Sequence, residues 1–252
     1  MRRTAALATA LVLSLAITGC GGGSDSTSSP DGDSGTTTSA TTGGVPDPGE
    51  LAGMLTTAEA LGAGWAAQSP PDSADVETPG VVPEAERKNL PRPQFCDAAT
   101  DESKQAAEDL AWQAVGIFAL EVDESPRNHQ VFVQEFLLAD EEADIDETYA
   151  ALAAGFAACE NQKTDYGDGV VGRNVPMPAT TLGAESVGVH EIVEEPSPRG
   201  PAVWDLRSVF AHDGPVLVWL QLGDVRVGKD VQPRIDDEAT RDIVAAVADA
   251  MG

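Results

Sequence analysis

The spacing of apolar residues in the middle of the chain predicts two strands that pair with each other. Residues 111–122 and 130–138 carry apolar side chains on both alternating faces, a pattern typical of strands inside a sheet. The run 124–127, Glu-Ser-Pro-Arg, lies between them and is rich in turn formers. We therefore expect an antiparallel hairpin with a longer loop.

A longer period predicts two main helices. Over residues 141–159, apolar residues recur at spacings of four and three and form one stripe along a helix face: Ile145, Tyr149, Leu152, Phe156 and Cys159. Asp140 is a candidate N-cap, and acidic residues crowd the first turns, as the helix dipole favours. The second helix is expected over 236–251, with its own apolar face: Ala239, Ile243, Val247 and Ala250.

Further strands are expected at four places: 169–177, 185–193, 202–211 and 216–223. The last two flank residues 212–215, His-Asp-Gly-Pro, which give a strong hairpin signal. Consecutive hairpins between helices predict the α+β class. We expect a single domain in which an antiparallel sheet of about five to six strands packs against two main helices.

A short helix and a surface loop are expected ahead of these strands. Thr56 is a candidate N-cap for the helix, and Glu59 would complete a capping box. Residues 68–93 are rich in proline and charge, which indicates a surface loop.

The first 19 residues have the features of a secretory signal. Arg2 and Arg3 precede an apolar run at 5–17 that is too short to span a bilayer comfortably. The run ends in Ile-Thr-Gly before Cys20 and resembles the bacterial lipobox. That resemblance implies that the Cys20 thiol is diacylated and that cleavage falls just before it. The alternative is an ordinary signal peptide with an incidental cysteine.

The composition changes sharply after this segment. Residues 20–50 consist of the lipidated cysteine and a flexible run of Gly, Ser, Thr, Asp and Pro, whose root-mean-square reach is roughly 30 Å. Residues 51–252 are long enough for one domain with a substantial core. We expect a lipid-anchored domain on the extracytoplasmic face of the cell membrane.

The chain is strongly acidic. Losing Arg2 and Arg3 with the signal leaves 13 basic residues against 42 acidic ones, a formal charge of −29. Such a chain repels the phosphates of nucleic acids, so we exclude DNA and RNA as partners. The expected partners are the membrane, through the lipid anchor, and an envelope ligand or protein.

Two cysteines remain once Cys20 is assigned to lipid. In an exported protein, Cys96 and Cys159 most simply form a disulfide. Closing a loop of about 64 residues would stabilise the fold by roughly 4 kcal/mol. The alternative is a metal or reactive thiol site.

The polar residues give no strong catalytic or metal motif. Residues 184–188, Ala-Glu-Ser-Val-Gly, nearly match the nucleophile elbow of hydrolases, but a strand pattern follows Ser186 where the elbow needs a helix. His129 and His212 are expected to be solvated, and His190 to be a satisfied histidine within a strand, since their spacing fits no zinc motif. We expect no catalytic residue, cofactor or metal.

The four tryptophans allow two interpretations. They could line a ligand cleft, but in a chain with 5% aromatic residues they more often form a core: Trp65, Trp112, Trp204 and Trp219.

Apolar motifs spread over residues 51–252 resemble a known family. They comprise Leu-Thr-x-x-Glu-Ala-Leu before Gly64-Trp65, Ala158-Cys159, the run 182–187, the strand 216–220 and the closing Ala-rich helix. Together they resemble actinobacterial surface lipoproteins related to the PknH-like extracellular sensor domain of receptor kinases. The resemblance implies an antiparallel sheet flanked by helices, a cleft proposed to hold a ligand, and two disulfides, of which this chain can form one after lipidation.

The sequence therefore favours a noncatalytic binding or sensor-like module anchored to the membrane. Two alternatives remain open, a cell-envelope hydrolase that uses Ser186 or a pair of carboxylates, and a protein-interaction partner in the envelope.

Overall fold

The structure, a computed structural model, describes residues 44–69, 76–121, 129–167, 170–175, 177, 181–183, 185–197, 200–228 and 231–252. All of these except Gly44 belong to one compact unit, Val45–Gly252. The expected signal peptide, Cys20 and most of the expected tether lie outside the described residues.

The compact unit starts six residues before the expected domain boundary at Leu51, because a helix forms at the end of the expected tether. Helix α1 (Pro48–Gly53) has Pro at its first position and Asp47 as its N-cap. The Asp47 carboxylate accepts hydrogen bonds from the backbone N–H groups of Gly49 and Glu50, and Glu50 in turn accepts one from the Asp47 N–H. This capping box satisfies the first turn of the helix.

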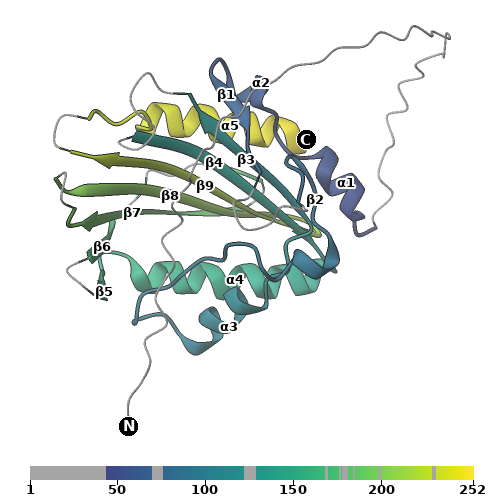
Figure 1. Cartoon of the computed structure of the whole chain (residues 1–252). Helices are drawn as coiled ribbons and strands as arrows, with labels where there is room; N and C mark the ends of the chain where they lie inside the picture. The colour runs from purple at the N-terminus through teal and green to yellow at the C-terminus, as the bar shows by residue number, and fades with distance from the viewer. Residues whose placement is uncertain are drawn as a thin grey trace, which may run out of the picture. The chain divides into compact units, whose positions relative to one another are not determined.

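One antiparallel sheet dominates the described part of the chain (Figure 1). Its order is β1-β3-β4-β9-β8-β7-β6-β5, and β2 also pairs with β3. The strands are β1 (Trp65–Ala67), β2 (Gly80–Val81), β3 (Ala114–Leu120), β4 (His129–Ala139), β5 (Lys163–Gly167), β6 (Val170–Val175), β7 (Glu185–Glu195), β8 (Ala202–Asp213) and β9 (Val216–Val227).

The α+β class is confirmed, but the predicted count of five to six strands is wrong, because the described residues form nine. The six strands predicted from the sequence correspond to β3, β4, β6, β7, β8 and β9. The three additional strands, β1, β2 and β5, have three, two and five residues. Strands this short give too few alternating positions to be recognised.

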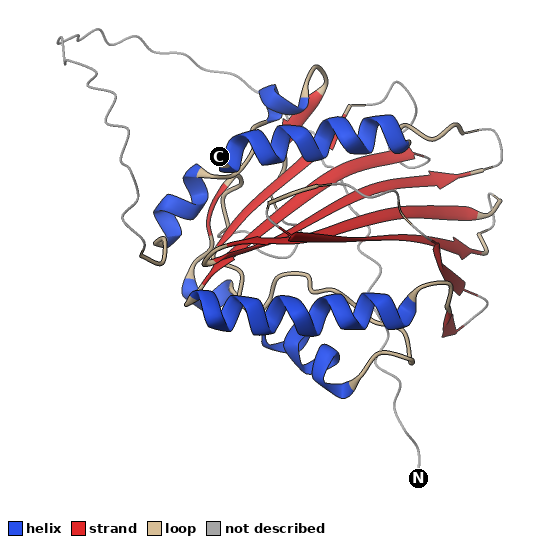
Figure 2. Ribbon diagram, turned by 180° about the vertical axis from the view of Figure 1, so that it is seen from behind, coloured by secondary structure: helices blue, strands red, loops and turns tan. Residues whose placement is uncertain are grey.

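Helices cover both faces of the sheet (Figure 2). Helix α4 (Glu142–Cys159) contacts β7, β8 and β9 on one face, and the smaller helix α3 (Asp101–Asp109) packs on α4. The stripe predicted for α4 is buried as expected. None of the helices in the described ranges has both the length and the apolar character needed to cross a membrane.

Helix α5 (Asp237–Met251) lies on the opposite face. Its side chains Ile243, Val244 and Val247 belong to the same buried cluster as Val218 and Leu220 of β9. Asp236 caps the helix by accepting the N–H groups of its first turn. The sheet is therefore the middle of three layers, with a separate core on each side.

The predicted turn between β8 and β9 is shorter than expected. Asp213 pairs with Val216, so only Gly214 and Pro215 form the loop. Gly214 has a φ of 52°, and the Pro215 ring fixes a negative φ, which matches a type II′ hairpin turn. His212, expected in the turn, therefore lies in β8.

The short helix begins one residue later than predicted. Helix α2 (Ala58–Leu61) is capped by Thr57, whose hydroxyl accepts the Ala60 N–H. Thr56 is instead buried, and its backbone N–H donates to the Glu135 carboxyl.

Candidate functional site

A connected set of ionisable and polar side chains lies on the sheet face that α5 covers. We call it the charge network, and its members are His129, His190, Asp205, Arg207, Asp224, Arg226, Asp237 and Thr240. Arg207 Nη1 donates to Asp237 Oδ1 at 2.8 Å and to Thr240 Oγ1 at 2.7 Å, which ties β8 to the start of α5. The network thus joins the sheet to a helix.

The prediction that His129 is solvated is wrong. Its side chain is fully buried, and Nε2 lies 3.0 Å from Asp224 Oδ1. The strand register explains the difference, since β4 pairs with β9 and brings His129 opposite Arg226 and next to Asp224. Partners on another strand cannot be read from local spacing alone.

Asp205 holds the centre of the charge network. Burial opposes its ionisation, but the hydrogen bond and charge of His190 and the charges of Arg207 and Arg226 outweigh it, so the pKa of Asp205 lies below its usual value. The distance from His190 Nε2 to Asp205 Oδ1 is 2.7 Å. Asp205 therefore stays ionised and supports its cationic neighbours.

Ser186 does not sit in a nucleophile elbow. It is the second residue of β7 and pairs with Ala211 of β8, so no turn or helix follows it. Ser186 and His190 share a face of the strand but are about 13 Å apart at four residues' rise. A serine nucleophile needs its base within hydrogen-bond reach, so this serine and the His190–Asp205 pair cannot act together.

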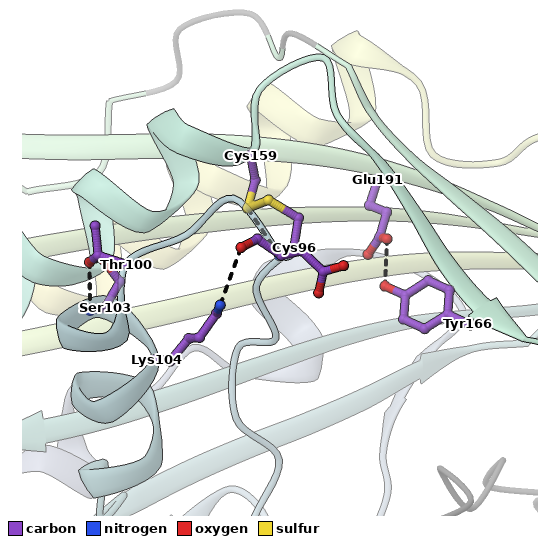
Figure 3. Close-up of a disulfide and its surroundings, with 8 residues drawn as sticks. Cys96, Thr100, Ser103, Lys104, Cys159, Tyr166 and Glu191 are labelled. Atoms are coloured by element: carbon purple, nitrogen blue, oxygen red, sulfur yellow. Dashed lines mark hydrogen bonds between the residues drawn. A yellow bond between two sulfur atoms is a disulfide. The ribbon is translucent and has the colours of Figure 1, made fainter. Parts of the chain in front are cut away.

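Glu191 of β7 pairs with a tyrosine. Tyr166 donates its hydroxyl to Glu191 Oε1 at 2.7 Å (Figure 3). Burial raises the pKa of Glu191, and burial together with the Glu191 charge raises the pKa of Tyr166. The pair binds a proton tightly, but it is not the pair of carboxylates that a glycoside hydrolase uses.

Two of the four tryptophans lie in the core between the sheet and α4. Trp219 of β9 stacks on Phe136 and Phe210, with ring centroids 4.9 and 5.5 Å apart, and Trp112 lies 5.8 Å from Trp219. Trp112 and Trp219 are almost completely buried, so these rings stabilise the fold and do not line a cleft. Trp65 and Trp204 are half-buried.

A disulfide joins Cys96 to Cys159 at the end of α4 (Figure 3). It clamps the irregular segment that precedes Cys96 onto the body. The same segment is held by Trp112 Nε1, which donates to the carbonyl oxygen of Pro91 at 2.9 Å. Phe95 packs on Phe156 of α4, with ring centroids 4.7 Å apart. The segment is thus fixed at several points along its length.

A solvent-open cavity of about 480 Å³ lies between this clamped segment and α3. The volume falls within the range of small-molecule sites. We call it the basic cavity, and it is lined by Lys88, Leu90, Arg92, Pro93, Gln94, Phe95, Lys104, Ala107 and Glu108. Leu90, Pro93 and Ala107 are buried and form its apolar part.

The charge of the basic cavity is opposite to that of the protein. Lys88, Arg92 and Lys104 line it against the single carboxylate of Glu108. Among the residues that the structure describes, none of the three cations takes part in an ion pair. The whole chain has 15 basic and 42 acidic residues, so the balance of basic to acidic residues in the cavity is the opposite of that in the chain.

The hydrogen bonds of these cations leave several donors free. Lys104 Nζ donates to the Asp97 carbonyl oxygen at 3.4 Å (Figure 3), a long contact for one of three ammonium protons. Arg92 Nη2 donates to the Lys88 carbonyl oxygen. Arg92 Nε is buried without a hydrogen-bond partner in the described part of the chain.

The sequence did not identify this cavity. Lys88 and Lys104 are two of only four lysines in the chain, and that scarcity was the available signal. Their convergence depends on an irregular segment folding back beside α3, which residue periodicity does not report.

Over the residues that the structure places, no group of three or more His, Cys, Asp or Glu side chains is arranged to hold a metal ion.

Comparison with known proteins gives only distant structural similarities. No family model matches the chain, and no curated protein does. The chain is similar to the extracellular domain of PknH from Mycobacterium tuberculosis, with 12% identity and a TM-score of 0.46, over 79% of this chain and 92% of that chain. It is also similar to LpqN, involved in cell envelope biogenesis of Mycobacterium tuberculosis, with 12% identity and a TM-score of 0.26, over 54% and 66%.

Proposed function

We propose that this chain is a noncatalytic binding module, anchored through Cys20 to the extracytoplasmic face of the cell membrane, and that the basic cavity is its ligand site. The observation that carries the proposal is the cavity itself. It has the volume of a small-molecule site, and the segment that forms it is clamped by the Cys96–Cys159 disulfide. A wall fixed in this way is preorganised for binding.

The noncatalytic part of the proposal rests on the partners of the reactive groups. His190 and Asp205 are engaged with each other and with arginines in the charge network, and Glu191 is engaged with Tyr166. The elbow-like Ser186 lies within a strand. The contacts of His190, Asp205 and Glu191 thus stabilise the fold, and Ser186 is part of the sheet.

Sulfur chemistry supports the proposed compartment. Disulfides persist in oxidising compartments outside the cytoplasm, which fits the pairing of Cys96 with Cys159. The apolar run that ends before Cys20 supplies the export signal and the lipid attachment point that the proposal requires.

Two measurements test this proposal. The full chain is expressed in a bacterium that processes lipoproteins, and mass spectrometry of its mature N-terminus should find a diacylated Cys20, with Cys20→Ala released from membranes. Thermal shifts of the purified domain against envelope lipids, glycans and peptides should then identify a ligand whose effect is lost when Lys88 and Lys104 are changed to Gln.

Other outcomes would contradict the proposal. An unmodified N-terminus on a protein free in the medium would refute the anchor. Turnover of an ester by the domain, abolished in Ser186→Ala, would favour the hydrolase. Stable co-purification with one envelope protein, unaffected by the cavity changes, would favour the interaction partner.

A further inference from the structure

We propose that the basic cavity binds a phosphate monoester, with the phosphate dianion held by Lys88, Arg92 and Lys104 and an apolar group of the ligand against Leu90 and Phe95. This inference rests on the proposed function, since it names the ligand class of the same cavity.

The charge balance of the cavity selects a dianion. Three cations and the carboxylate of Glu108 leave a formal charge of +2. A phosphate monoester carries about −1.5 to −2 at neutral pH, so one such group neutralises the cavity. A carboxylate or a phosphodiester, with one negative charge, would leave about half of the positive charge uncompensated.

The donor types also fit phosphate. The two lysines that line the cavity come from different segments, Lys88 from the clamped segment and Lys104 from α3. Lysine binds phosphate as a point charge with three rotatable donors, which suits a tetrahedral group. Arg92 Nη2 already donates to the carbonyl oxygen of Lys88, so Arg92 adds its positive charge to the cavity without offering its whole fork to the ligand.

The apolar lining indicates an organic ligand. Leu90, Pro93 and Ala107 are buried, and the Phe95 ring is half-buried beside the charged residues. Inorganic phosphate would leave this wall in contact with water. A ligand that covers it gains the free energy of removing apolar surface from water. The cavity therefore suits a phosphate carried on an apolar group.

The chain's overall charge limits the size of the ligand. A formal charge of −27 repels polyanions over distances longer than the cavity. At about 0.1 M salt the Debye length is about 10 Å, so a single phosphate inside the cavity is dominated by the three nearby cations. The favoured ligand is a small molecule or a lipid headgroup with one terminal phosphate.

Isothermal titration calorimetry with phenyl phosphate at pH 7.5 and 0.1 M NaCl tests the inference. Phenyl phosphate should bind at least about fivefold more tightly than inorganic phosphate, because its ring covers the apolar wall, and phenol alone should not bind measurably. The double change Lys88→Gln and Lys104→Gln should weaken binding by about tenfold or more. Glu108→Gln should strengthen it, because it removes the opposing charge.

Lys163→Gln provides a matched control, because Lys163 is an exposed lysine on β5 and is not part of the cavity lining. Its affinity for phenyl phosphate should equal that of the wild type. Lys88, Glu108 and Lys163 are exposed and Lys104 is half-buried, so the unfolding midpoint of each variant is measured to check that the fold is retained. Equal weakening in the Lys163 variant would show nonspecific attraction and overturn the inference.

A second arm separates the two sources of a terminal phosphate. Sedimentation with phosphatidylcholine vesicles, with and without phosphatidate, tests the lipid headgroup. Phosphatidate-dependent binding that phenyl phosphate competes away and the double lysine variant loses assigns the site to a lipid. Binding of phenyl phosphate without vesicle binding assigns it to a soluble ester.

The inference fails if neither phenyl phosphate nor phosphatidate binds. If the cavity then takes an uncharged ligand, with protection of residues 88–95 from hydrogen exchange, the proposed function stands without its phosphate. If no envelope component protects the cavity, the proposed function fails as well.

Discussion

At the scale of single residues, the least expected group is Glu135 in the middle of β4. Its side chain is completely buried on the α5 face, where the Thr56 N–H donates to Oε2 at 3.0 Å. Burial raises the pKa of Glu135 to about 8, and the Thr56 hydrogen bond only partly offsets this. The carboxyl therefore keeps its proton in the folded protein at neutral pH, although an unfolded chain would release it near pH 4.5.

This difference predicts how stability depends on pH. Between about pH 4.5 and 8 the folded state holds a proton that the unfolded state has lost, so the free energy of unfolding falls as pH rises, by at most about 1.4 kcal/mol per unit. Glu135→Gln keeps an acceptor for Thr56 and cannot ionise. Urea unfolding should show similar stability for variant and wild type at pH 5 and a more stable variant at pH 8.5.

The comparison needs a control for the acidic background. Glu147→Gln makes the same chemical change on the exposed side of α4 and should follow the wild-type curve. A constant difference between Glu135→Gln and the wild type from pH 5 to 8.5 would show that Glu135 does not hold the proton.

The pKa of Asp205 shifts in the opposite direction to that of Glu135. Because its pKa is lowered in the folded protein, its contribution to stability is complete above its usual pKa near 3.8 and is lost as pH falls below that value. Asp205→Asn removes the carboxylate that Arg207 and Arg226 share, although Arg207 keeps Asp237 and Arg226 keeps Asp224. It should lower the free energy of unfolding by about 2–3 kcal/mol at pH 7.

The Asp205→Asn deficit, measured by chemical denaturation, should shrink below about pH 4. Asp242→Asn, an exposed change on α5, should stay within about 0.5 kcal/mol of the wild type at every pH. A deficit that persists unchanged at pH 3 would mean that the amide disturbs packing and that charge is not the cause.

At the scale of elements, the cavity wall depends on how closely α3 approaches α4. Gly155 of α4 lies at the contact, where a Cβ atom would come within 2.8 Å of the Phe95 ring and of the Ser103 Cβ. Gly155→Ala therefore has to push Phe95 and α3 outward. Overpacking of this kind costs about 1–3 kcal/mol, more than the gain of up to about 1 kcal/mol in helix propensity.

Gly53→Ala is a matched comparison, since this glycine lies in α1 with nothing within 4 Å of the added methyl group. Differential scanning calorimetry should show a lower unfolding temperature for Gly155→Ala and an unchanged or higher one for Gly53→Ala. If both variants gain stability, α3 can move away from α4 without a cost in the free energy of unfolding, and the cavity wall is less rigid than proposed.

The same contact shows why the sequence predicts some elements and not others. The stripe of α4 was readable because large apolar residues repeat along it. Helix α3 was not predicted, because it buries only Ser103 and Ala107 and has no apolar stripe. Strand β5, Lys-Thr-Asp-Tyr-Gly, lies at the sheet edge and lacks alternation for the same reason. Elements that bury few large apolar side chains cannot be recognised from a pattern of hydrophobic residues.

The candidate site was hidden for a related reason. Cys96 and Cys159 were paired by counting, yet the basic cavity that their disulfide clamps is formed by side chains of an irregular segment. Charged residues in such a segment normally indicate solvent exposure. Only the fold shows that Lys88, Arg92 and Lys104 line the same cavity. The burial of His129 is equally invisible in the sequence, because its partner Asp224 lies on another strand.

At the scale of the whole molecule, the excess of carboxylates sets how the fold responds to salt. The formal charge of −27 reflects an excess of carboxylates, and these repel one another more strongly in the compact folded state than in the expanded unfolded chain. The ion pairs of the described residues engage few of the carboxylates, so most of this repulsion is exposed to screening. Raising NaCl from 10 to 500 mM should therefore increase the free energy of unfolding, by on the order of 1–2 kcal/mol.

The type of salt shows whether screening is the cause. Choline chloride and NaCl should act equally at the same ionic strength, because screening depends on ionic strength and not on the identity of the cation. MgCl₂ at matched ionic strength should match them too, and a larger rise would indicate that the acidic surface binds the divalent cation. A free energy of unfolding that falls with NaCl would mean that attractive pairs such as those of the charge network, and not repulsion between carboxylates, dominate the electrostatics of the fold.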